Sequence, residues 1–192
     1  MKENTMTFLE YQELAMRTAV YPAAARVQYP AMKLAGEAGE AAGKLADLKP
    51  GGDTGPLLAE LGDVLWYVAA LTRDLGFEEP WMQESLATLE ERSLGNVADL
   101  SLPGGVLRLV AAACDPVERY GKLIRDSGLD ADGGVPREAA KLMLGSTLVA
   151  LRYLAVCAHA LGSSLEAVAS ENVAKLASRK ARGVISGSGD TR

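Results

Sequence analysis

The feature that most constrains the fold is a pair of neighbouring stretches, 31–48 and 57–75, in which apolar residues recur at helical spacing. In the first stretch they are Leu34, Ala38, Ala41 and Leu45. In the second they are Leu57, Leu61, Val64, Val68 and Leu71. Recurrence at steps of three and four residues is typical of one buried helix face. The pattern predicts two amphipathic helices.

Each predicted helix carries two acidic residues beside its apolar face. The pairs are Glu37 with Glu40 and Glu60 with Asp63. A spacing of three places both members of a pair on one side of a helix. Antiparallel packing would bring the four carboxylates together, and so many cannot all stay ionised without a positive partner. Because hard divalent cations prefer oxygen ligands, the sequence predicts a Mg²⁺ or Mn²⁺ site.

The alternative is that these carboxylates lie on solvated helix faces, where acidic residues three apart are common. Four residues further on, only Glu40 meets a basic residue, Lys44, although Lys33 precedes Glu37 by four. Solvated helix faces often interleave opposite charges more regularly than this. The repetition of the pair in two adjacent helices favours the metal site.

The composition favours an all-α protein. Aromatic residues make up only 5% of the chain, and alanine and leucine dominate without alternating β-branched runs. Apolar residues at 48% and charged residues at 23% are typical of a globular protein. A net charge of −5 argues against general nucleic-acid binding, which needs a basic surface. Metal ions would still allow an acidic protein to handle polyphosphates.

Compartment and redox state follow from similar features. Cys114 and Cys157 lie in apolar helical contexts and are expected to be reduced core residues. The N-terminus has no apolar signal region, and no uninterrupted apolar run approaches about 18 residues. A cytoplasmic protein without a membrane-spanning helix is expected.

Three segments resemble the MazG-like all-α nucleoside triphosphate pyrophosphohydrolases. They are residues 34–40, 60–67 and 172–183, the first two holding the acidic pairs. The resemblance implies a helical bundle that binds Mg²⁺ through Glu37, Glu40, Glu60 and Asp63. It also implies cleavage of an NTP or dNTP to the monophosphate and pyrophosphate, and assembly as a dimer or a dimer of dimers.

The second half resembles a degenerate copy of the first. Asp115 aligns with Glu37, whereas Met143 and Ser146 align with Glu60 and Asp63. A breaker-rich loop at 126–136 matches the loop at 49–56. We expect two fused MazG-like units forming a pseudo-dimer, 1–98 and 99–183, followed by a flexible tail, 184–192. Chance alignment of Ala/Leu-rich helices is the alternative.

Phosphate-binding residues are predicted near the end of the chain. Asn172, Lys175 and Arg179 are spaced i, i+3, i+7 and therefore share a helix face. Their counterparts in the first unit form an incomplete set, so we expect one composite site with metals on the first unit and phosphate contacts from the second. The alternative is a solvated basic helix end, which the helix dipole favours.

Other expectations concern boundaries and single residues. Helices are expected at 7–19, capped by Thr5 or Thr7, and from Pro80 to about residue 93, with a linker at 94–105. Pro30 is expected to end an extended step before the first carboxylate helix. Further expected features are an exposed Gln12, a core or interface His159, core packing of Trp66 and Tyr67, and close packing against Gly36, Gly39 and Gly43.

The predicted activity is Mg²⁺-dependent hydrolysis of a nucleoside or deoxynucleoside triphosphate, with Glu37 orienting or deprotonating the attacking water. Two alternatives stay open. One is a related enzyme acting on a compound such as phosphoribosyl-ATP, and the other is a non-catalytic helical regulator that binds nucleotide. A single histidine disfavours a di-iron carboxylate bundle, and the chain has no phosphate-binding glycine loop of the P-loop type.

Overall fold

A computed structural model describes residues 5–95, 97, 100–130 and 132–184, and within them every continuous element of secondary structure is a helix. The α-helices are α1 (Phe8–Met16), α2 (Gln28–Asp47), α3 (Gly55–Asp74), α4 (Leu86–Leu94), α5 (Leu102–Arg125), α6 (Arg137–Ala160) and α7 (Leu165–Ala181). Two 3₁₀ turns, η1 (Ala23–Ala25) and η2 (Pro80–Gln83), lie between them. The predicted all-α fold is confirmed.

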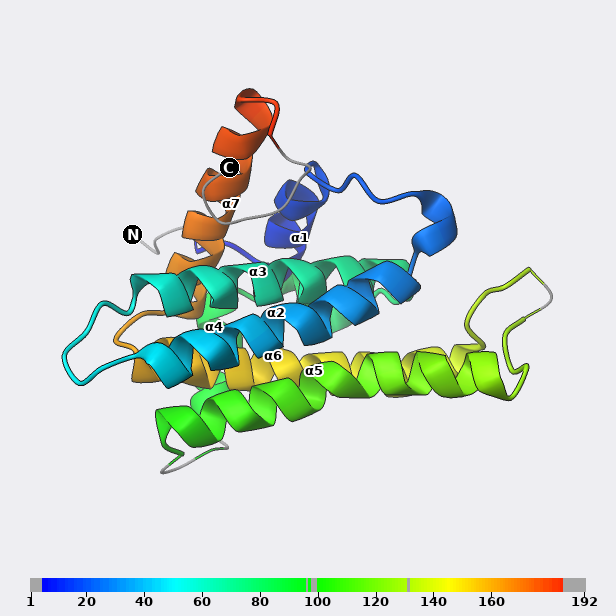
Figure 1. The fold of residues 1–192 in the computed structure, drawn as a ribbon. Coiled ribbons are helices and arrows are strands. Elements are labelled where there is room, and N and C mark those ends of the chain that lie inside the picture. The colour runs from blue at the N-terminus through cyan, green and yellow to red at the C-terminus, as the bar shows by residue number, and fades with distance from the viewer. Residues whose placement is uncertain (1–4, 96, 98–99, 131, 185–192) are drawn as a thin grey trace.

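Four long helices, α2, α3, α5 and α6, run side by side (Figure 1). Helix α2 lies between α3 and α5, and α6 packs against both α5 and α3. Helices α1 and α7 cross α3 at a steep angle on the side away from α5 (Figure 1), and α4 packs on α6. Consequently α3 contacts α2, α6, α1 and α7 and forms the centre of the fold.

The apolar faces predicted for the two carboxylate helices form the seam between them. Leu34, Ala38 and Ala41 of α2 are fully buried, as are Leu61 and Val64 of α3. Further along α3, Val68 and Leu71 are also inaccessible to solvent, while Leu45 of α2 is only partly buried. Because each buried Leu or Val side chain contributes about 1.5–3 kcal/mol, this seam fixes the register of α2 against α3.

Several helix boundaries differ from prediction because of proline. Helix α2 starts at Gln28, so Pro30 lies in its first turn instead of ending an extended step. The first N–H groups of a helix have no intrahelical partner, and proline therefore costs little there. Similarly, α5 starts at Leu102 with Pro103 in its first turn and Ser101 as its cap, which shortens the predicted linker.

The segment after Pro80 was also predicted wrongly. Pro80 starts only the short 3₁₀ turn, and a new helix, α4, begins at Leu86. The Ser85 hydroxyl caps α4 by accepting a hydrogen bond from the Thr88 amide at 3.1 Å. By contrast, the predicted cap of α1 is confirmed, since Thr7 and Glu10 form a reciprocal capping box.

Three polar or reactive residues lie where they were not expected. Gln12 is buried and donates its amide to the Ala69 carbonyl at 2.9 Å. His159 is not a core residue, because its side chain is 63% exposed. Cys114 is exposed, whereas Cys157 is buried as predicted. All three residues lie in Ala- or Leu-rich stretches, and such a stretch does not predict whether one particular side chain points into the core or into solvent.

The glycine-rich face of α2 is open. A methyl group added at Gly36, Gly39 or Gly43 would meet no other atom within 4 Å. Close packing of another helix of this chain against these glycines, as predicted, is therefore not found among the described residues.

Helix α6 is long and apolar enough to span a membrane by length and composition alone. However, 56% of its apolar window is buried inside the protein, where it packs against α5, α3 and α4. Its hydrophobicity is therefore that of a core helix, which is consistent with a soluble protein.

The order of helices is compatible with the predicted internal repeat. The sequence α2–α3–α4 is followed by α5–α6–α7, and both α3 and α6 are followed by a Leu-Gly pair. Gly76 and Gly162 adopt φ values of 71° and 73°, which glycine reaches without strain. The division at residue 98 stays a prediction, and the predicted flexible tail lies outside the described residues after Val184.

Candidate metal centre

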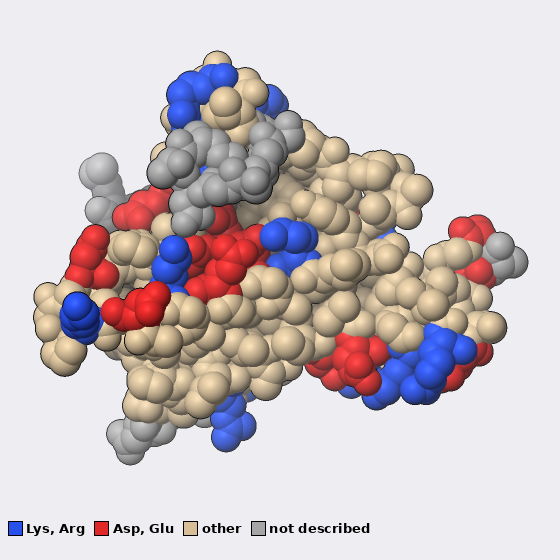
Figure 2. Space-filling model, viewed as in Figure 1, with Lys and Arg blue, Asp and Glu red and all other residues tan. Residues whose placement is uncertain are grey.

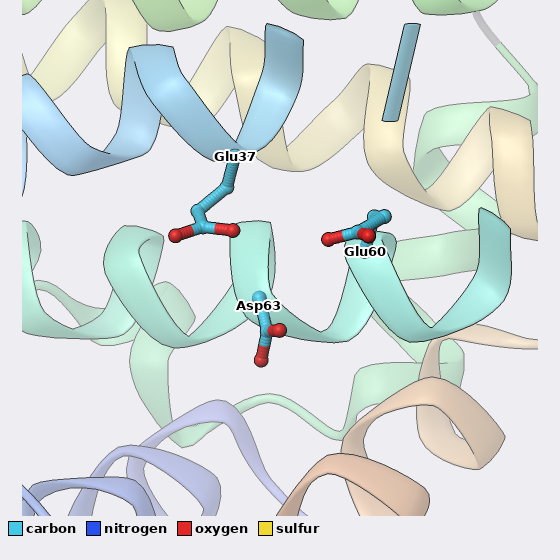
Figure 3. Close-up of side chains that lie close together, drawn as sticks. All are labelled: Glu37, Glu60 and Asp63. Atoms are coloured by element: carbon cyan, nitrogen blue, oxygen red, sulfur yellow. The ribbon is translucent and has the colours of Figure 1, made fainter. Parts of the chain in front are cut away.

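Three carboxylates from two helices meet on one side of the α2–α3 seam. Glu37 of α2 and Glu60 and Asp63 of α3 each place an oxygen atom within 4.8 Å of the others (Figure 3). We call these three residues the acidic cluster. Glu40, the fourth predicted ligand, is exposed one turn further along α2 and lies outside the cluster.

The local sequence explains why these carboxylates are buried. Glu37 directly precedes Ala38, and Glu60 directly precedes Leu61, both fully buried in the seam. Each carboxylate therefore lies at the edge of the apolar face, and Glu37 and Glu60 are only 8% and 5% exposed. Asp63 lies one turn beyond Glu60 and is directed toward α7 (Figure 3).

Each carboxylate of the acidic cluster is paired with a lysine. Lys33 lies 2.8 Å from Glu37, Lys44 lies 3.5 Å from Glu60, and Lys175 lies 2.6 Å from Asp63. On the surface, acidic side chains gather over the α2–α3 pair with basic side chains beside them (Figure 2). The six groups together carry no net charge when all are ionised.

Lys44 corrects one expectation. The sequence predicted a pair between Glu40 and Lys44 on the same helix, but Lys44 reaches across the seam to Glu60. The Lys44–Glu60 pair depends on the register of α2 against α3. The spacing of residues within α2 alone does not predict that register. Lys33, in contrast, pairs with Glu37 at the i, i+4 spacing visible in the sequence.

Burial is the main electrostatic influence on Glu37 of the acidic cluster. Burial raises the pKa of Glu37, and Asp63 and Glu40 add to the increase, whereas Lys33 opposes it. Burial also raises the pKa of the Tyr67 hydroxyl, with further contributions from Tyr29 and Glu37. A buried carboxylate beside other carboxylates binds a cation, or a proton, more readily than an isolated one.

A hydrogen-bonded chain from α1 through α7 orients Asp63. The Asn172 amide donates to Asp63 at 3.1 Å, and the hydroxyl of Tyr11 donates to the Asn172 carbonyl oxygen at 2.9 Å. Both Tyr11 and Asn172 are buried, with Asn172 only 2% exposed. Burial, assisted by Asp63, raises the pKa of Tyr11 well above its ordinary value, so the hydroxyl remains a donor.

Gly62 allows α7 to approach α3 at this point. A methyl group at residue 62 would lie 3.2 Å from both Cβ and Nδ2 of Asn172, closer than ordinary van der Waals contact. A cavity of about 170 Å³ opens beside this contact, lined by Leu58, Ala59 and Gly62 of α3 and by Val168, Glu171, Asn172 and Lys175 of α7.

The residues predicted to bind phosphate are only partly gathered at the cluster. Asn172 and Lys175 both contact Asp63. Arg179 lies one turn further along α7, half-buried, and among the described residues it makes no side-chain hydrogen bond or ion pair with the acidic cluster. Lys33 and Lys44 were not predicted to be part of this site.

Trp66 and Tyr67, which follow the acidic cluster on α3, differ in how deeply they are buried. Trp66 is buried and donates its indole N–H to the Ala15 carbonyl at 3.1 Å, as expected for a core residue. Tyr67 is only half-buried, and its ring lies edge-on to Trp66 with Lys33 at 5.8 Å from its centre.

The donor set of the acidic cluster suits a hard metal ion. All three ligand atoms are carboxylate oxygens, and two of the three carboxylates are almost fully buried. Carboxylate oxygens favour Mg²⁺, Mn²⁺ or Ca²⁺ over softer metals, which prefer nitrogen and sulfur. The cluster could therefore bind a metal ion.

Comparison with known proteins identifies a phage relative. No protein-family model matches the chain, and no solved structure matches it. The Gene 37 protein of Mycobacterium phage L5 is 39% identical over 100 residues, which cover 45% of this chain and 82% of the relative. The chain therefore belongs to the same family as the Gene 37 protein of Mycobacterium phage L5.

Proposed function

We propose that the protein is a Mg²⁺-dependent nucleoside triphosphate pyrophosphohydrolase of the MazG-like type. It would cleave a nucleoside or deoxynucleoside triphosphate to the monophosphate and pyrophosphate, acting in the cytoplasm as a homodimer. The observation that carries this proposal is the acidic cluster, in which Glu37, Glu60 and Asp63 meet beside Lys175.

Glu37, Glu60 and Asp63 would hold the metal, and Glu40 would border the site from the exposed side of α2. A bound Mg²⁺ ion supplies charge neutralisation for phosphate oxygens and lowers the pKa of a coordinated water. The cluster fits this ion because Mg²⁺ is held through a few carboxylates and retains several waters, leaving room for phosphate oxygens.

The chain's own residues divide the remaining work. Glu37 is the general base, because its raised pKa makes the carboxylate a better proton acceptor than an ordinary one. It takes the proton as the water oxygen bonds to one phosphorus of the α–β anhydride and the bridging P–O bond breaks. The pyrophosphate or the monophosphate leaves with that bridging oxygen.

The Asp63 side chain is held for this role by Asn172 and Lys175. Lys175 lies between Asp63 and the cavity on the α3–α7 side, where its ammonium can pair with a phosphate oxygen. Lys175, from the second half of the chain, would thus bind phosphate beside carboxylates from the first half. Arg179 would join only if the substrate extends a further turn along α7.

The test is a pyrophosphate-release assay on a panel of NTPs, dNTPs and phosphoribosyl-ATP with Mg²⁺. We expect turnover of at least one NTP or dNTP and a loss of about 10²-fold or more in Glu37→Gln and Asp63→Asn. Glu118→Gln, which removes an exposed carboxylate on α5, is the matched control and should remain active.

The outcomes separate the alternatives. Turnover of phosphoribosyl-ATP alone would assign the related pyrophosphohydrolase activity. Nucleotide binding without turnover would leave the non-catalytic regulator. Full activity of Asp63→Asn would remove the acidic cluster from the mechanism.

A further inference from the structure

We propose that Lys33, Lys44 and Lys175 form an exchangeable counterion set that neutralises the acidic cluster before the metal arrives and then binds the substrate's phosphates. This inference rests on the proposed function and adds Lys33 and Lys44 to the residues that contact substrate. The ligand class is a metal-bound polyphosphate.

The first support is the one-to-one pairing. Every carboxylate of the acidic cluster has its own ammonium partner, at 2.8, 3.5 and 2.6 Å. Lys33 and Lys44 reach the cluster from α2, and Lys175 reaches it from α7. The lysines therefore surround the place where a metal would bind.

The second support is the contrast in exposure between the partners. The lysine side chains are 36%, 35% and 26% exposed, whereas those of Glu37 and Glu60 are 10% and 7% exposed. Lys33 and Lys44 thus lie at the rim with their carboxylates further inside, whereas Lys175 and Asp63, at 26% and 24% exposed, lie at a similar depth. A lysine has a flexible four-carbon stem and a charge that remains well solvated at a rim, so it can change partner without moving the helix.

The charges explain why an exchange is needed. With three carboxylates and three ammonium groups the site is neutral, so a divalent cation entering it must compete with the lysines. A bound Mg²⁺ ion would repel the three ammonium groups and compete with them for the carboxylate oxygens. A triphosphate then brings roughly four negative charges, more than one Mg²⁺ ion neutralises, and the displaced ammonium groups can pair with its oxygens.

A purely structural role for the three ion pairs makes a different prediction. If the lysines only hold α2, α3 and α7 together, removing one would loosen the cluster and weaken both metal and phosphate binding. Exchange instead predicts opposite signs. Removing a lysine should strengthen metal binding in the absence of nucleotide and weaken polyphosphate binding in the presence of metal.

The experiment measures both affinities by calorimetry on the full-length protein. Mg²⁺ is titrated alone, and inorganic tripolyphosphate is then titrated at saturating Mg²⁺. For Lys33→Gln and Lys44→Gln we expect Mg²⁺ affinity to rise by about threefold to tenfold, since one unit charge a few ångströms from a dication is removed. Tripolyphosphate affinity should fall by about tenfold in the same variants.

Two controls isolate the position of the charge. Lys122→Gln breaks an ion pair with Glu118 on α5 at the same i, i+4 spacing as Lys33 and Glu37, and it should leave both affinities unchanged. Lys33→Arg keeps the charge and should restore the wild-type Mg²⁺ affinity. Helical circular dichroism of each variant checks that the fold is retained.

Two results would overturn the inference while leaving the proposed function intact. In the first, the wild-type protein binds Mg²⁺ and the lysine variants bind it equally well or more weakly. In the second, tripolyphosphate affinity is unchanged in both Lys33→Gln and Lys44→Gln. A wild-type protein that binds no Mg²⁺ would overturn the proposed function as well, and that result is visible before any variant is made.

Discussion

At the scale of single residues, Glu37 shows the conflict between stability and a binding site. Its carboxylate is buried, and burial raises its pKa above the ordinary value of 4.5. A raised pKa means that the folded state holds the proton more tightly than the unfolded state. The carboxylate therefore costs no stability below its ordinary pKa, and the cost appears as pH rises through the interval up to the raised value.

We accordingly expect Glu37→Gln to stabilise the metal-free protein at pH 7, with an advantage that fades as pH falls through the raised pKa toward 4.5. Thermal unfolding in EDTA between pH 4 and 8 measures this. Excess Mg²⁺ should reverse the order, because only the wild type gains the full binding energy. If Glu37→Gln is less stable at pH 7 in EDTA, the ion pair with Lys33 outweighs the cost of burial.

The two cysteines show what local sequence does not contain. Both lie in apolar helical stretches, yet Cys114 is exposed and Cys157 is buried. Burial raises the pKa of the Cys157 thiol to about 12, and the thiolate is the reactive form. A thiol reagent at pH 8 should therefore label Cys114 alone in the native protein and both cysteines in denaturant. Native labelling of Cys157 by mass spectrometry would show that α6 opens readily.

At the scale of helices, apolar periodicity predicted α2, α3 and their shared seam, because burial of one face follows directly from spacing. It did not predict the helix starts just before Pro30 and Pro103 or the short 3₁₀ turn at Pro80, since proline is compatible with both a first helical turn and a turn outside a helix. The ion pair between Lys44 and Glu60 was not predicted either, because it depends on how α2 and α3 are aligned along their shared seam.

Gly62 tests whether close contact between α3 and α7 supports the site. We expect Gly62→Ala to destabilise the protein by about 1–3 kcal/mol, since the added methyl would crowd Asn172. The displacement of Asn172 from Asp63 should also reduce Mg²⁺ affinity.

Gly36→Ala is the matched control on α2. Its methyl group meets nothing within 4 Å, and the better helix propensity of alanine should stabilise the protein by up to about 1 kcal/mol. Denaturant unfolding and Mg²⁺ titration compare the two, and equal effects would contradict a special role for Gly62.

At the scale of the whole molecule, the packing of α2–α3 against α5–α6 places the two predicted units in one bundle. In the predicted second unit, the positions that align with the acidic cluster carry altered residues. Ser146, which aligns with Asp63, donates a hydrogen bond to Asp115, which aligns with Glu37. Met143, which aligns with Glu60, is fully buried, and Arg119 forms an ion pair with Asp115. A guanidinium group thus supplies the positive charge that a metal would supply in the first unit.

This asymmetry predicts one cation-binding cluster in each chain. Calorimetry should give about one strong Mg²⁺-binding cluster per chain, lost in Asp63→Asn and retained in Asp115→Asn. The Asp115 variant should instead lose stability. Although burial opposes the effect, hydrogen bonds from Arg119 and Ser146 lower the pKa of Asp115, so its contribution is present above the ordinary value of 3.8 and disappears as pH falls through the lowered value.

The loss in Asp115→Asn should be less than about 1 kcal/mol at pH 7, because the ion pair is solvent-accessible and screened. Denaturant unfolding at pH 7 and at pH 3 provides the comparison, with a smaller difference expected in acid. Strong Mg²⁺ binding that disappears in Asp115→Asn would place a working metal site in the second unit. It would also contradict the view that Arg119 has replaced the metal there.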